Sequence, residues 1–148
     1  MWRIPAVERL EQWRRFRETL NELPFDVAAL ETARFWQNAP FTPYYLDYDR
    51  PDTWPDPWTL IAENYYCDLA KALGIVYTLH LSNHKDIEIS LRILKHPQTR
   101  FFYNLVWIND GKYVLNLEPG EIVNKKSIPE ELTLVIEYNS TELNLDRY

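Results

Sequence analysis

"WPDPWTLIAENYYCDLAKALGI", residues Trp54 to Ile75, is the stretch that decides how this chain is organised. It begins with Asp56 and Pro57, an N-cap residue followed by a proline whose missing N–H is not needed at the first position of a helix. Apolar residues then follow at helical spacing: Trp58, Leu60, Ile61, Tyr65, Leu69, Ala72 and Leu73. Gly74 suits a helix C-cap, so the stretch predicts helix up to residue 73.

Cys67 is the only cysteine of the chain, and the continuity of this helix decides what it can do. In one unbroken helix, Cys67 lies in the middle and behaves as a small buried apolar residue. If the chain turns at Glu63 and Asn64, Cys67 lies in the first turn of a second helix, where the helix dipole stabilises a thiolate. Asp68 disfavours the thiolate by like charge in either case. Both alternatives stay open, and the sequence favours a structural Cys67.

Two further helices are predicted upstream, joined to this stretch by an irregular connector. Pro5 opens the first helix and Pro24 ends it, with an apolar stripe of Val7, Leu10, Trp13 and Leu20. Asp26 is expected to cap the second helix, whose apolar side consists of Val27, Leu30, Ala33 and Trp36. Residues 38–55 are rich in proline and aromatic residues and follow neither the helix nor the strand period.

Beyond residue 74, apolar and polar residues alternate with the period of strands. The predicted strands are residues 75–82, 86–95, 100–109, 112–118 and 132–138, with residues 142–147 as a candidate sixth. Asp110 and Gly111 suit the two-residue type I′ turn of a hairpin. This order predicts an α+β fold, with N-terminal helices packed on an antiparallel sheet of five to six strands. We expect a single domain over residues 1–148, helical to about residue 74 and β-rich from residue 75.

The composition limits the classes of function. The chain has 148 residues and a net charge of −6, with one basic cluster at Arg14, Arg15 and Arg17, which argues against nucleic-acid binding. One cysteine excludes an internal disulfide and a cysteine-based zinc site. No apolar run is long enough to cross a membrane, and the N-terminus is too charged for a secretory signal. We therefore expect a protein of the bacterial cytoplasm or of a virion, with other proteins as partners and no metal or cofactor.

The surroundings of Cys67 resemble the transglutaminase-like branch of the papain fold. "YCDLAKALGIVYTLHL", Tyr66–Leu81, is similar to the helix that the nucleophilic cysteine opens in that family, and "YNLVWINDGKYVLNLEP", Tyr103–Pro119, is similar to its hairpin. The resemblance implies that Cys67 is the nucleophile, that Tyr103 stands at the family's histidine position and that Asn116 stands at its aspartate position. A tyrosine normally keeps its proton at pH 7 and does not replace the histidine base. The resemblance therefore implies a degenerate member of the family.

The register of the predicted hairpin places Tyr103 and Asn116 close together. If Asp110 and Gly111 form the loop, Leu105 pairs with Asn116, and residues two apart on a strand share one face. Tyr103 and Asn116 are then diagonal neighbours, as a base and its orienting partner are. The three histidines lie on or beside the first two predicted strands, away from this position, and are not expected to bind a metal: His80, His84 and His96.

A second resemblance concerns the aromatic segments before and around Cys67. "FWQNAPF", "WPDPWTLI" and "YYCDLAKALGI" resemble segments of small proteins of tailed bacteriophages. This resemblance implies a non-catalytic structural or interaction protein of the portal, neck or baseplate, and the sequence favours it over an enzyme. The expected anchors toward phage structural proteins are Trp36, Phe41, Tyr44, Tyr45, Trp54 and Trp58. The alternative is a cysteine-dependent hydrolase or acyltransferase of the transglutaminase-like fold, with Cys67 as nucleophile.

Overall fold

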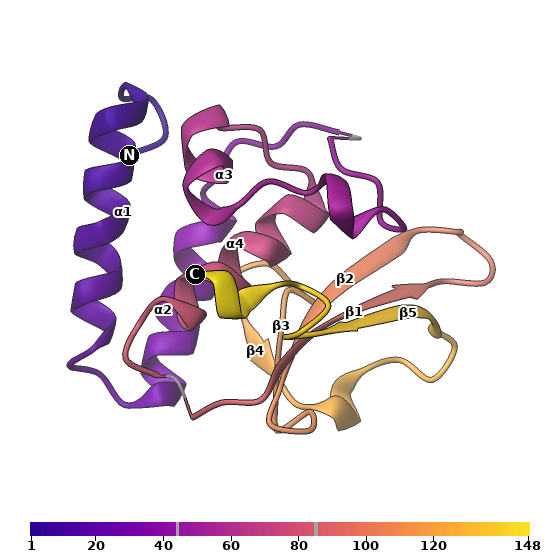
Figure 1. Ribbon diagram of the computed structural model, residues 1–148. Coiled ribbons are helices and arrows are strands. Elements are labelled where there is room, and N and C mark those ends of the chain that lie inside the picture. The colour runs from indigo at the N-terminus through magenta and orange to yellow at the C-terminus, as the bar shows by residue number, and fades with distance from the viewer. Residues whose placement is uncertain (44, 85) are drawn as a thin grey trace.

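The computed structural model describes residues 1–43, 45–84 and 86–148, and it places a layer of helices against one side of an antiparallel sheet (Figure 1). The helices come first along the chain: α1 (Ala6–Leu20), α2 (Phe25–Gln37), the 3₁₀ turn η1 (Pro51–Thr53), α3 (Pro57–Glu63) and α4 (Asp68–His80). The strands follow: β1 (Ile89–Lys95), β2 (Phe102–Ile108), β3 (Tyr113–Leu115), β4 (Ile122–Val123) and β5 (Thr133–Asn139). Their order in the sheet is β4-β3-β2-β1-β5. The predicted α+β fold is confirmed.

Helix α4 forms the centre of the main core. It is buried continuously from Leu69 to Leu79 except at Lys71, and it packs against β1 and β2 as well as against α2 and α3. A helix that is apolar nearly all round lacks the one-sided stripe that distinguishes helix from strand in a sequence. The strand predicted over residues 75–82 is therefore wrong, because α4 continues to His80, and Gly74 lies inside the helix rather than at its end.

Gly74 allows Trp36 of α2 to pack directly against the backbone of α4. A Cβ atom at Gly74 would lie 2.4 Å from atoms of the Trp36 ring. One turn further along α4, the buried Thr78 hydroxyl accepts hydrogen bonds from the indole N–H groups of Trp13 and Trp36, each at 3.0 Å. The same hydroxyl donates to the Gly74 carbonyl at 2.6 Å. These bonds tie α1 and α2 to α4 inside the core.

The predicted hairpin is present with the predicted register. Strands β2 and β3 pair Val106 with Leu115, Trp107 with Val114 and Ile108 with Tyr113. Asp110 and Gly111 have φ values of 55° and 80°, as the central residues of a type I′ turn require. The short strand β4 was not predicted, because two residues carry no periodic signal, and the candidate sixth strand contains instead the 3₁₀ turn η3 (Leu145–Arg147).

The two faces of the sheet have different partners. One face, which includes Leu91, Ile93 and Val106, packs against the helices in the main core. The other face carries a smaller cluster formed by Leu94, Leu105, Val114 and Leu132, against which Tyr103 and Trp107 pack. The 3₁₀ turn η2 (Lys125–Ser127) lies between β4 and β5.

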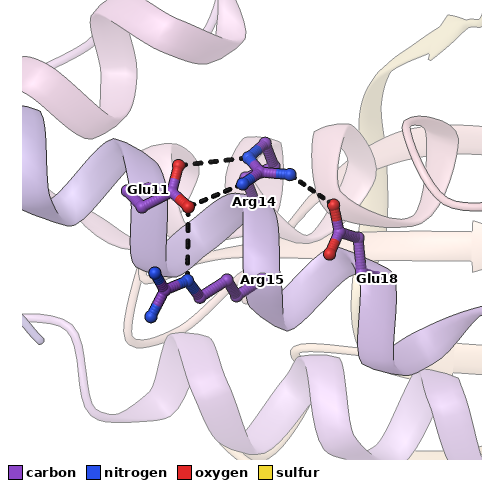
Figure 2. Close-up of polar contacts among 4 residues, drawn as sticks. All are labelled: Glu11, Arg14, Arg15 and Glu18. Atoms are coloured by element: carbon purple, nitrogen blue, oxygen red, sulfur yellow. Dashed lines mark hydrogen bonds and ion pairs between the residues drawn. The ribbon is translucent and has the colours of Figure 1, made fainter.

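Two arginines of the basic cluster, Arg14 and Arg15, pair with carboxylates of α1. Arg14 lies 2.6 Å from Glu11 and 2.5 Å from Glu18, and Arg15 lies 3.2 Å from Glu11 (Figure 2). The hydrogen bond from Arg14 lowers the pKa of Glu11. These pairs have helical spacing and face solvent.

Within the described ranges, no helix combines the length and apolar character that a membrane crossing requires.

Candidate active site

Cys67 lies at the start of α4, because the chain turns between α3 and α4. The Asp56 side chain caps α3 by accepting a hydrogen bond from the Thr59 N–H at 2.8 Å, as predicted. Helix α3 ends at Asn64, which has the left-handed φ of 60°. Cys67 is the N-cap residue of α4 and has extended backbone angles. Of the two alternatives that the sequence leaves open, the structure therefore selects the broken helix.

A buried arginine holds this turn in place. Arg9 of α1 donates to the carbonyls of Ile61 at 3.1 Å and Ala62 at 2.8 Å, and it also donates to the Ile4 carbonyl. The carbonyls of Ile61 and Ala62 belong to the last turn of α3, where a cation is favourable and where helical partners are missing. The Asn64 side chain donates to the Trp2 carbonyl at 3.0 Å. The end of α3 is thus fixed to the N-terminal segment.

Tyr66 anchors the residue directly before Cys67. Its ring is fully buried and lies 5.2 Å from the ring of Trp2 and 5.3 Å from the ring of Trp36. Burial raises the pKa of Tyr66. Its carbonyl accepts a hydrogen bond from the Thr42 N–H at 3.0 Å, beside a parallel bridge between Phe41 and Tyr66. Cys67 is therefore held between an anchored residue and the first turn of α4.

Cys67 lines a cleft of about 870 Å³. The walls come from the connector between α2 and η1, the start of α4, the turn from β1 to β2 with the first half of β2, and the segment after β3. Cys67 itself is 7% exposed, so its side chain is covered on the core side and meets the cleft on the other. This volume falls in the range of ligand-binding sites.

Asn104 of β2 is the polar residue of the cleft that sequence reasoning missed. Alternation along β2 puts it on the same face as Val106, which packs toward the helices. It is 7% exposed, and among the described residues its side-chain amide has no hydrogen-bond partner. Tyr103, one residue earlier, packs with the cluster on the opposite face of the sheet and borders the cleft. Asn104 and the apolar Val106 are two residues apart on one strand and therefore share a face. A polar residue on an otherwise apolar face was the signal that could have identified Asn104.

Asn116 directly follows β3 and also lines the cleft. It has a left-handed φ of 72° and donates through its side-chain amide to the Asn104 carbonyl at 2.9 Å. Backbone pairing between β2 and β3 stops at Val106 and Leu115. Beyond this pair, the side-chain bond from Asn116 links the two segments in place of a backbone hydrogen bond. The structure thus brings Cys67, Tyr103 and Asn116 to one cleft and uses Asn116 to hold the backbone of Asn104.

The aromatic residues predicted as anchors are in different environments. Phe41 is 60% exposed at the cleft, and Trp58 is 44% exposed and contacts the ring of Tyr148. Tyr45 and Trp54 are half-buried against the main core. Trp36 is 1% exposed and belongs to the core. Tyr44 lies outside the described residues.

The histidines all belong to the described part of the chain, and none of them lines the cleft. His80 ends α4, the Nε2 atom of His84 lies 2.8 Å from the Leu20 carbonyl, and the Nδ1 atom of His96 accepts from the backbone of its own turn. No group of three or more histidine, cysteine, aspartate or glutamate side chains that could hold a metal occurs within residues 1–43, 45–84 and 86–148.

Comparison with known proteins finds a similar fold among solved structures and no similar sequence. The sequence matches no protein-family model and no curated protein. Calcium-bound LapG from Legionella pneumophila has 14% sequence identity and a TM-score of 0.71, over 93% of this chain and 78% of LapG. A second LapG structure has 14% identity and a TM-score of 0.70, over 91% and 76%. EGTA-treated LapG has 15% identity and a TM-score of 0.69, over 91% and 74%.

These structures correct the function that the sequence favoured. The likeness to LapG shows the fold alone, and it confirms the transglutaminase-like fold that the sequence resemblance implies. The prediction of a non-catalytic bacteriophage protein is wrong: the structural matches are to LapG, and no finding supports a phage, virion or tail protein. The cysteine-dependent alternative fits the structural matches better.

Proposed function

We propose that this protein is a cysteine-dependent hydrolase or acyltransferase with Cys67 as its nucleophile. One observation carries the proposal: Cys67 is the N-cap of α4 and lines a large cleft, in a fold that LapG shares over 93% of the chain. A thiolate is the reactive form of cysteine, and the N-terminus of a helix favours it.

The reaction is acyl transfer through a thioester. The Cys67 sulfur attacks an acyl carbon, the new carbon–sulfur bond forms, and the bond to the leaving group breaks. Water then releases the acid, or an amine takes the acyl group. Asn104 is the side chain we assign to hydrogen bonding with the acyl oxygen, since its amide lines the cleft without another partner among the described residues. Asn116 is its positioning residue through the bond to the Asn104 carbonyl.

We assign the thiol proton to solvent, since none of the three histidines lines the cleft. A departing amine must take up a proton, whereas a thiolate or phenolate leaves without one. Activated esters and thioesters are therefore the substrates that test the proposal most directly.

The test is acylation of Cys67 by p-nitrophenyl acetate. We expect a burst of p-nitrophenol and an acetyl group on the peptide that contains Cys67, with both lost in Cys67→Ala. The control is the same chain unfolded in urea, in which the helix N-terminus and the cleft are gone. Iodoacetamide labelling and acetylation of the folded protein no faster than of the unfolded chain would exclude Cys67 as a nucleophile.

A further inference from the structure

We infer that the cleft selects an extended peptide that carries a large apolar side chain next to an acidic residue. The apolar side chain would rest on Phe41, Phe101 and Phe102, and the carboxylate would face Arg100. The inference rests on the proposed function and specifies the substrate of the same site.

The cleft is bordered by phenylalanines that solvent reaches. Phe41 is 60% exposed, Phe101 67% and Phe102 40%, and all line the cleft. They come from two separate segments: Phe41 from the connector before α3, and Phe101 and Phe102 from the end of the β1–β2 turn and the first residue of β2. Phenylalanine is among the residues most often buried, and a group of exposed ones marks a binding surface. The convergence of two segments on one cleft is what an apolar subsite requires.

The ring of Phe102 and the backbone of Phe41 are held in place before any ligand binds. The ring of Phe102 lies 5.0 Å from the ring of Tyr48, and the Lys95 ammonium lies 5.5 Å from the Phe102 ring. The backbone of Phe41 is fixed by its bridge to Tyr66, the residue before Cys67. A preformed surface loses little side-chain freedom on binding, which favours affinity for a matching apolar side chain.

The charges of the cleft favour a peptide over a hydrocarbon chain. Arg100 borders the cleft beside Phe101 and forms no ion pair with any described residue. A guanidinium group binds a carboxylate through paired hydrogen bonds. Asp47 and Asp68 interrupt the apolar wall, and a fatty acyl chain laid over them would remove their hydration without replacing it. A peptide can meet both kinds of surface.

The experiment measures peptide binding to the Cys67→Ala variant by fluorescence anisotropy. Dye-labelled peptides of equal length carry Phe-Glu, Ala-Glu, Phe-Lys or Ala-Lys between glycines. We expect Phe-Glu to bind most tightly, with about a tenfold loss on replacing Phe by Ala. Equal affinity for all four peptides would overturn the inference, and so would stronger binding of a dye-labelled dodecanoate.

Variants in the Cys67→Ala background identify the subsite. We expect Phe41→Ser and Phe101→Ser to weaken Phe-Glu binding about tenfold and to leave Ala-Glu binding unchanged. Arg100→Glu should invert the preference between Glu and Lys. The matched control is Leu134→Ser, at an apolar residue of β5 that is 55% exposed and lies outside the cleft. A loss of equal size in this control would overturn the inference.

The two proposals fail in different measurements. Binding to Cys67→Ala requires no reaction, so peptide selectivity without acetylation of the wild-type protein rejects the nucleophile and keeps the subsite. Acetylation of Cys67 without peptide selectivity rejects the subsite and keeps the nucleophile.

Discussion

A single step along β2 separates two side chains with different surroundings. Tyr103 packs with Leu94 and Leu105 on the face away from the helices, whereas Asn104 lies on the face with Val106. Cys67 belongs to the core on the helix side of the sheet. We therefore expect residue 104 of β2 to be the position that can present a base to the thiol, one residue after the position that the sequence resemblance implies.

Placing a histidine at these two positions tests the assignment. We expect Asn104→His to speed iodoacetamide labelling of Cys67 about a hundredfold at pH 7, since an imidazole accepts the thiol proton. A plot of the labelling rate against pH should then have an inflection at about pH 6.5. The matched control, Tyr103→His, should label like the wild type because its side chain lies on the other face. Equal acceleration in both variants, or in neither, would contradict the assignment of residue 104.

At the scale of elements, α4 connects the helical layer to the sheet. Its buried surface contacts β1 and β2. Its Thr78 hydroxyl accepts hydrogen bonds from Trp13 of α1 and Trp36 of α2. Because the Trp36 ring lies against Gly74, the packing distance between α2 and α4 depends on the absence of a side chain there.

We expect Gly74→Ala to destabilise the fold by about 1 to 2 kcal/mol. Alanine favours a helix by about 1 kcal/mol over glycine, but an added methyl group in a packed core costs about 1 to 3 kcal/mol when the neighbour cannot move. Trp36 is restrained here by its bond to Thr78 at 3.0 Å. Urea unfolding measures the difference, and Lys71→Ala, at a half-buried position of the same helix, is the control. Unchanged or increased stability would show that Trp36 shifts freely.

At the scale of the whole molecule, buried tyrosines link stability to alkaline pH. Burial is the main cause that raises the pKa of Tyr66 and of Tyr77. A raised pKa means that the folded state keeps the proton while the unfolded chain loses it above about pH 10. Stability is therefore fully present below about pH 10 and falls as the pH rises beyond it.

Part of the loss of stability at alkaline pH should come from Tyr66. Each buried tyrosine lowers the free energy of unfolding by about 1.4 kcal/mol per pH unit above its unfolded pKa. We expect Tyr66→Phe to reduce the slope by about this amount, since the hydroxyl makes only a 3.5 Å contact with the Ile61 carbonyl. Tyr65→Phe, at the exposed neighbour, should keep the wild-type slope. Urea unfolding at several pH values above about pH 10 measures how the free energy of unfolding changes with pH. The same dependence on pH in Tyr66→Phe and Tyr65→Phe would contradict a contribution from Tyr66.

The sequence by itself determined the features that depend on neighbouring residues. Asp56 and Pro57 specify the start of α3, and Asp110 and Gly111 specify the turn and hence the register of β2 and β3. These signals are local, because a cap or a tight turn is stabilised within a few residues. The α+β class follows from them, since helices precede paired strands along the chain.

Only the tertiary structure decided where α4 ends and what surrounds Cys67. Residues 75–80 remain helical because α4 is covered by helices on one side and by the sheet on the other, a burial that no alternation in the sequence expresses. The turn at Asn64 depends on Arg9, which lies 52 residues before the carbonyl of Ile61 that it binds. The cleft joins four distant segments, and contacts of that range are set by packing of the whole chain rather than by local pattern.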